Sequence, residues 1–165
     1  CDYGEYQGRV VIPSFDDLGN ISFFVARSYG NDWMKYKNPQ VSKDIIFNDL
    51  NINWDDDIIL VEGVFDAMSC KNAIPLLGST LRENSKLFQK ICLKKPTIYL
   101  ALDHDAKEKE MQAAKKLKEY GIRVLIIDTS GYSDIAEMPS KVIKERKQNA
   151  SVVCDLDYLH YKLDF

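Results

Sequence analysis

The sequence predicts an α/β domain in which a parallel β-sheet carries helices on both faces, preceded by a small β-rich subdomain. Between residues 58 and 128, short apolar runs alternate with segments of helical character. Strands that are apolar along their whole length are typical of parallel sheets, because both faces of such sheets are buried. The first 54 residues show no such alternation and contain two β-rich runs around a polar turn.

The two β-rich runs predict a hairpin. They cover residues 9–15 and 21–27, and the sequence DDLGN between them has the composition of a turn. A polar and aromatic loop follows at 29–38 and is closed by Pro39. The acidic run at 55–57 marks the expected boundary, so we assign residues 1–54 to the β-rich subdomain.

The second part of the chain is expected to form the α/β domain, over residues 55–150. Pro75 indicates an edge position or a strand start, and Gly121 is placed to end a helix. Residues 151–165 form a C-terminal extension, for which we expect a helix. The expected strands are 58–61, 73–77, 97–102 and 123–128, and the expected helices are 64–71, 83–93 and 106–120.

Composition narrows the classes of protein. The 165 residues carry a net charge of -3, which argues against a stand-alone, high-affinity DNA-binding module but leaves room for an enzyme with an acidic metal site. No apolar run is long enough to cross a membrane. The first residues lack signal-peptide features, and the chain begins without Met, so we interpret it as a piece of a longer or processed protein.

Acidic residues follow two of the expected strands. Asp103 and Asp105 come directly after one strand, and Glu62 ends another. The carboxyl ends of parallel strands meet at one edge, where the working residues of such sheets gather. Three carboxylates there would bind a hard cation such as Mg2+, or one of them would hold a proton for acid–base chemistry. Alternatively, Asp105 has a structural role as the N-cap of the next helix.

Two further patterns each allow two interpretations. Asp134 and Glu137, three residues apart, would share a helical face at a second metal, or would form a capped helix start. The stretch that holds Arg27, Lys35 and Lys37 also contains aromatic residues. Its cations would hold phosphates while its rings stack on bases, or it is an ordinary solvated loop.

Several motifs together resemble a known family. VEGVFDA at 61–67, LGST at 77–80 and LDHD at 102–105 are similar, in order and spacing, to the motifs of the Toprim domain of primases, topoisomerases and some nucleases. A preceding block resembles that of bacterial and phage primases; its segments are GRVVIP at 8–13, DLGN at 17–20, VAR at 25–27 and KYKNP at 35–39. His104 and Ser133 depart from the residues common in the family.

The resemblance implies the catalytic domain of a DNA primase, which makes short RNA primers on single-stranded DNA from ribonucleoside triphosphates. It implies Mg2+, or Mn2+ in its place, a cytoplasmic location in a bacterial or phage-infected cell, and a replicative helicase reached through regions absent from this chain. A Toprim-type nuclease and a non-catalytic binding module are the alternatives. The implied site residues are Glu62 (acid–base or metal-positioning), Asp103 and Asp105 (metal ligands), Asp134 and Glu137 (a further metal), Asp66 (support), and Arg27, Lys35 and Lys37 (template and nucleotide).

Overall fold

The computed structural model describes residues 4–30, 33–78 and 80–154, apart from the side chain of His104. The chain divides into two compact units, Cys1–Asn51 and Ile52–Phe165. No helix in the described part of the chain is long and apolar enough to cross a membrane.

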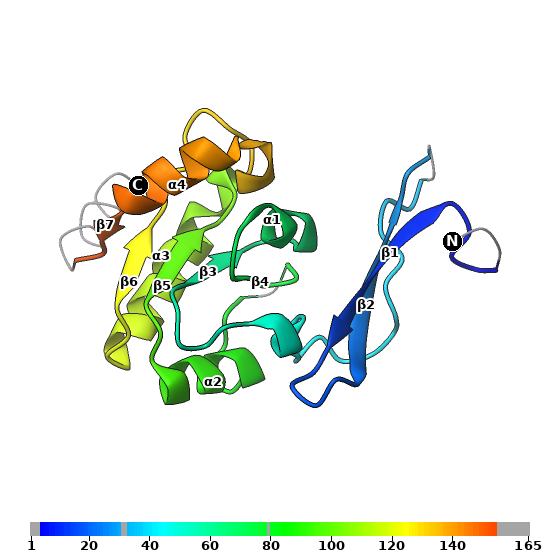
Figure 1. Ribbon diagram of the computed structural model, residues 1–165, viewed down its shortest axis with the longest axis horizontal. Helices are drawn as coiled ribbons and strands as arrows, with labels where there is room; N and C mark the ends of the chain where they lie inside the picture. The colour runs from blue at the N-terminus through cyan, green and yellow to red at the C-terminus, as the bar shows by residue number, and fades with distance from the viewer. Residues whose placement is uncertain (1–3, 31–32, 79, 155–165) are drawn as a thin grey trace. The chain divides into compact units, whose positions relative to one another are not determined.

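The first unit is built on the hairpin that the sequence predicts. Strands β1 (Arg9–Phe15) and β2 (Ile21–Ser28) pair antiparallel (Figure 1), and a short 3-10 helix, η1 (Asp49–Asn51), ends the unit. The turn between the strands is closed by Asp16, whose Oδ1 accepts the amides of Asn20 at 2.8 Å and Leu18 at 3.0 Å. The polar turn residues therefore set the hairpin register locally.

The second unit contains a five-stranded sheet in the order β4-β3-β5-β6-β7. The first four strands are mutually parallel, and β7 runs antiparallel to β6. The predicted parallel sheet is thus confirmed, with one antiparallel strand added at its edge. The bounds are β3 Ile58–Val61, β4 Ala73–Pro75, β5 Ile98–Ala101, β6 Val124–Ile126 and β7 Ser151–Val152.

The two edge strands of this sheet, β4 and β7, can be compared with what the sequence predicted. Pro75 ends β4, an edge strand, in agreement with the prediction made from its missing N–H. The helix expected for 151–165 is wrong at its start, because Ser151 and Val152 pair with Ile126 and Leu125 of β6. The rest of that expected helix, 155–165, lies outside the described residues.

Helices cover both faces of the sheet, as predicted (Figure 1). On one face, α1 (Val64–Ser69), η3 (Ile135–Glu137) and α4 (Ser140–Gln148) contribute to one buried cluster with Ile59 and Val61. The opposite face of the sheet is covered by α2 (Lys86–Lys94) and α3 (Lys107–Glu119), whose buried side chains include Phe88, Ile91 and Leu117. The apolar strands are therefore enclosed on both sides.

The sequence did not predict α4. Among its nine residues only Ile143 is buried, and six are charged or amide-bearing, so its apolar stripe is too narrow to stand out. The helix is held on the sheet by tertiary contacts, including the ion pair of Lys147 with Asp57 at 3.3 Å and its amine above the Tyr99 ring at 4.6 Å.

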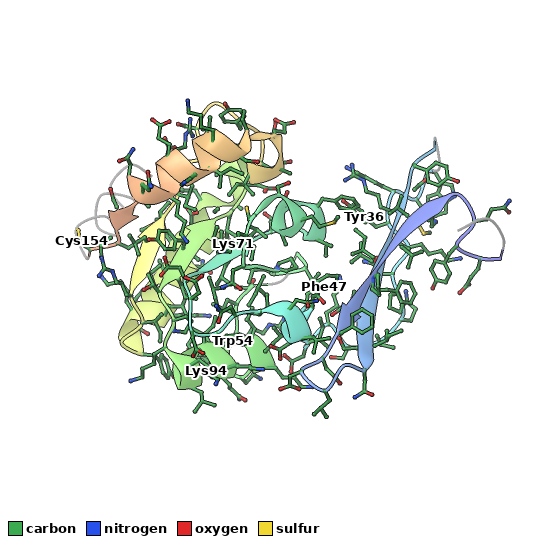
Figure 2. All side chains as sticks on the ribbon, viewed as in Figure 1. Tyr36, Phe47, Trp54, Lys71, Lys94 and Cys154 are labelled. Atoms are coloured by element: carbon green, nitrogen blue, oxygen red, sulfur yellow. The ribbon has the colours of Figure 1, made fainter. Side chains whose placement is uncertain are left out.

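Among the described residues, the cysteines form no disulfide. Cys70 and Cys92 are half-buried, and Cys154 is exposed beyond β7 (Figure 2). Burial raises the pKa of Cys70 to about 11, so this thiol stays protonated at neutral pH. Cys70 therefore behaves as a small packing residue.

Candidate active site at the ends of the parallel strands

Strand register brings the two acidic motifs level with each other. Val61 is opposite Ala101 in the parallel pairing of β3 with β5. Glu62 follows Val61 directly, and Asp103 follows Ala101 by two residues, so both lie at the carboxyl ends of neighbouring strands. This is the edge at which parallel sheets collect functional groups.

A backbone turn fixes the position of Glu62. The amide of Gly63 donates to Asp66 Oδ2 at 2.7 Å, and the Asp66 side chain is buried at the start of α1. A Cβ atom at position 63 would lie only 2.9 Å from that oxygen, so a larger residue there would displace the Asp66 carboxylate. Asp66 thus supports the segment that carries Glu62, a role that the family resemblance also implied.

A second buried carboxylate anchors the loop after β5. Glu110 on α3 is 4% exposed, accepts the Leu102 amide at 3.4 Å and receives the Lys107 amine at 2.8 Å. Asp105 lies in the 3-10 helix η2 (His104–Ala106), and the N-cap of α3 is Ala106. The interpretation of Asp105 as the cap of that helix is therefore wrong.

Carboxylates surround Asp103. Burial is the largest of the effects that raise the pKa of Asp103 from its usual 3.8 to about 6. The remaining effects are the negative charges of four carboxylates, Asp66, Glu62, Asp134 and Asp105. Of the acidic residues selected from the sequence, Asp66, Glu62, Asp105 and Asp134 therefore lie near enough to act electrostatically on Asp103.

Glu62 has a partner that the sequence did not reveal. The amine of Lys109, on the first turn of α3, lies 2.9 Å from Glu62 Oε1. This hydrogen bond is the main reason that the pKa of Lys109 is raised, so the amine carries its positive charge.

The pair Asp134 and Glu137 forms a local turn. Asp134 Oδ1 caps η3 by accepting the Glu137 amide at 3.0 Å, and Glu137 Oε2 accepts the Ser133 amide at 3.2 Å. The capping interpretation therefore describes the contacts of both residues. Asp134 also acts electrostatically on Asp103, whereas Glu137 is exposed.

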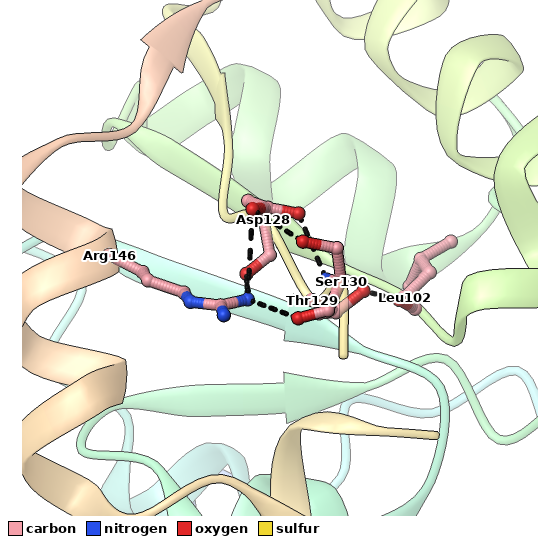
Figure 3. A network of polar contacts seen from close by, with 5 residues as sticks. All are labelled: Leu102, Asp128, Thr129, Ser130 and Arg146. Carbon is pink, nitrogen blue, oxygen red and sulfur yellow. Dashed lines mark hydrogen bonds and ion pairs between the residues drawn. The ribbon is translucent and has the colours of Figure 1, made fainter. Parts of the chain in front are cut away.

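The loop between β6 and η3 is tied down by Arg146 of α4 (Figure 3). Its Nη1 donates to the carbonyls of Asp128 at 2.6 Å and Ser130 at 2.9 Å. The Asp128 carboxylate accepts the amide and hydroxyl of Ser130, and these bonds hold the pKa of Asp128 below its usual range. Asp128 is thus engaged in positioning the loop that leads to Asp134.

The donor set at the strand ends fits a hard cation. All of its candidate ligands are carboxylate oxygens, and the crowding at Asp103 would be relieved by a positive charge. Across residues 4–30, 33–78 and 80–154, no three His, Cys, Asp or Glu side chains converge closely enough to hold a metal ion between them. Mg2+ commonly binds through one or two carboxylates, with water and substrate phosphate oxygens completing its shell.

The basic residues selected from the sequence gather in the first unit. After β2 the chain turns back, so that the Ser28 amide donates to the Lys35 carbonyl and the Lys37 amide to the Ala26 carbonyl, both at 2.9 Å. The Tyr36 ring (labelled in Figure 2) then has the guanidinium of Arg27 at 5.7 Å and the amine of Lys35 at 5.8 Å from its centroid.

Lys37 is less available than Lys35. Its amine donates to the Glu5 carbonyl at 3.0 Å, forms an ion pair with the Glu5 carboxylate at 3.3 Å and lies 5.3 Å from the Tyr6 ring centroid. Lys35 is exposed, as are the aromatic residues Tyr29 and Trp33. This arrangement provides cations and flat rings on one short segment.

Residues 59–138 match the family model described as Toprim-like. This segment has a Toprim-like fold. It contains Glu62, Asp103, Asp105, Asp134 and Glu137, and it excludes the hairpin unit.

Relatives and solved structures extend the likeness beyond the Toprim-like domain. A DNA primase of Thermotoga maritima is 25% identical over 152 residues, which cover 82% of this chain and 26% of that protein. A DNA primase domain from Pseudomonas aeruginosa has a TM-score of 0.79 at 22% identity, over 98% of this chain and 57% of that one. A DnaG primase catalytic domain bound to ssDNA has a TM-score of 0.71 at 17% identity, over 91% and 54%.

These likenesses establish the fold of both units. The chain spans about a quarter of the Thermotoga primase and little more than half of the two solved chains.

Burial of Asp103 and the carboxylates around it predict an unusual pH dependence of stability. Folding raises the pKa of Asp103 from its usual 3.8 to about 6. The folded protein therefore binds a proton more readily than the unfolded chain. In the absence of metal, the stability of the fold thus increases as pH falls from about 6 toward 3.8. Above pH 6 the ionised Asp103 side chain lowers the stability of the folded protein. We therefore expect Asp103→Asn to raise the Tm at pH 8 in EDTA, with a gain that shrinks toward pH 5.

The exposed Asp55→Asn substitution is the matched control, and thermal unfolding is followed by circular dichroism. A lower Tm for Asp103→Asn at pH 8, or a gain that grows on acidification, would contradict the crowding of charge at Asp103.

Proposed function

We propose that this chain is the catalytic part of a DNA primase, which joins ribonucleotides into a short RNA primer on a single-stranded DNA template. The observation that carries the proposal is the half-buried Asp103 at the strand ends of a Toprim-like domain, with the carboxylates of Glu62, Asp105 and Asp134 around it. The likeness to primases continues through the hairpin unit, which supports a primase over other Toprim activities.

Each acidic residue has a proposed role. Asp103 and Asp105 would hold the divalent cation, with Asp134 near enough to act on the same charge, and Glu62 would position the cation or accept the proton of the attacking 3′-hydroxyl. A bound Mg2+, or Mn2+ in its place, would supply neutralisation of the triphosphate and activation of the hydroxyl. Glu137, which is exposed and bonded within its own turn, is proposed for a further cation only as the resemblance implies.

The hairpin unit would hold the nucleic acid and the incoming nucleotide. Arg27 and Lys35 flank the Tyr36 ring, and Lys37 is paired with Glu5, so Lys35 is the cation best placed to meet a phosphate. The net charge of -3 leaves most of the attraction to such local patches. Cationic side chains beside aromatic rings are the usual elements of single-strand binding.

The proposal also covers the domains, partner and location of the protein. The chain would consist of a primase-type subdomain at 1–54, the catalytic domain at 55–150 and an extension at 151–165. A replicative helicase would be reached through regions outside this chain, and the reaction would take place in the cytoplasm of a bacterial or phage-infected cell.

The proposal predicts a synthesis reaction that depends on Glu62 and Asp103. The purified chain is incubated with labelled ribonucleoside triphosphates, single-stranded DNA and Mg2+ or Mn2+, and nucleotides and DNA are resolved on one gel. We expect template-dependent oligoribonucleotides, reduced at least about 100-fold by Glu62→Gln or Asp103→Asn because each removes charge at the cation and the reacting hydroxyl. Glu108→Gln, an exposed change on the same helix as Lys109, is expected to keep full activity.

Other results of this assay would contradict parts of the proposal. Cut DNA without synthesis would assign the site to a Toprim-type nuclease. Full synthesis by either Glu62→Gln or Asp103→Asn, with each variant folded by circular dichroism, would contradict the proposed roles.

A second prediction concerns the hairpin unit. If Lys35 contacts a phosphate, Lys35→Gln will weaken single-stranded DNA binding and reduce the slope of log K against log salt by about 0.7. Fluorescence anisotropy over a range of KCl concentrations measures both. Lys94→Gln, at an exposed position at the end of α2, is the control that should leave the slope unchanged, and an equal slope for Lys35→Gln and wild type would exclude the contact.

A further inference from the structure

Lys109 is a positive group in direct contact with a candidate metal-binding carboxylate. Its amine lies 2.9 Å from Glu62 Oε1, in a pair that joins α3 to the end of β3 across 47 residues of sequence. The Lys109 side chain is 46% exposed and the Glu62 side chain 24% exposed. The pair is therefore half-open to solvent, and its two partners can separate without leaving a buried charge.

The position of Lys109 relates it to the whole acidic cluster. Besides Glu62, the negative charges of Asp105 and Asp103 act on the Lys109 amine. These are the carboxylates that crowd one another at the strand ends. One ammonium group thus supplies part of the positive charge that the cluster otherwise lacks.

A lysine and a divalent cation compete for the same carboxylate. An oxygen lone pair of Glu62 that accepts the Lys109 N–H is not available to a cation, and the positive charge of the amine repels a cation at neighbouring oxygens. An exposed lysine pair is weak, because it is solvated and costs side-chain entropy. A divalent ion can therefore displace it, at some loss of affinity.

We propose that Lys109 is a displaceable counter-ion of Glu62. In the metal-free protein it neutralises Glu62 and holds it in place, and it gives way when a divalent cation binds. The pair therefore lowers the affinity of the site and stabilises the cluster while it is empty. The inference rests on the proposed metal-dependent function and adds a residue that controls access to that site.

The proposal predicts that removal of the lysine charge tightens metal binding. Mn2+ is titrated into the purified chain by isothermal titration calorimetry at low ionic strength. Lys109→Met is expected to bind Mn2+ about threefold to tenfold more tightly than wild type, because a competing partner and a repelling charge are both lost. Lys109→Arg, which keeps the charge, is expected to bind like wild type.

Two controls separate this effect from a general change in charge. Lys115→Met, on the same helix in an exposed pair with Glu119 at 3.9 Å, removes the same charge away from Glu62 and should change the affinity by less than Lys109→Met. In a Glu62→Gln background the gain from Lys109→Met should largely vanish, because the residue that couples the lysine to the metal is gone.

The outcomes are distinct. Equal Mn2+ affinity in wild type and Lys109→Met, or a gain that persists in the Glu62→Gln background, would overturn the counter-ion role while leaving the proposed function standing. Absence of Mn2+ binding in every folded variant would overturn both.

Discussion

Repulsion between carboxylates is the constraint on which the strand-end site depends. Asp103 is half-buried and has four other carboxylates near it, so its pKa rises to about 6. A fold selected for stability alone would separate these charges or pair them all with cations. Here Lys109 partly compensates Glu62, and the surrounding framework keeps the remaining charges together.

That framework is made of polar anchors around the cluster, of which Asp66 and Glu110 are buried. Asp66 holds the turn after β3 through the Gly63 amide, and Glu110 holds the loop after β5 through the Leu102 amide. Arg146 ties the loop after β6 through two carbonyls. Each anchor fixes the backbone next to an acidic motif, so the site is positioned by rigid elements whose own polar groups are satisfied.

The sequence predicted the parts of the fold that depend on local pattern. Four buried parallel strands, the hairpin and the convergence of Glu62 with Asp103 followed from apolar runs and from what comes after them. Tertiary contacts determined the rest. The two-residue strand β7 exists only by pairing with β6, and α4 buries little beyond Ile143, so neither has a periodic signature.

Lys109 shows the same limit at the site. It belongs to a lysine- and glutamate-rich helix, and its partner Glu62 lies 47 residues away. Nothing in the local sequence separates this lysine from its neighbours on α3. The contact arises because α3 follows β5, the strand that pairs with β3.

A single titration tests the central claim, that the crowded carboxylates at the strand ends bind a divalent cation. Carbon-13 NMR of the Asp103 carboxyl carbon, followed from pH 3 to 8, gives its pKa in EDTA and in the presence of Mg2+. The structure predicts a pKa of about 6 without metal and a clear fall when Mg2+ is added, because the cation stabilises the ionised form. A pKa near the ordinary 3.8 that does not respond to Mg2+ would contradict both the crowding and the proposed metal site.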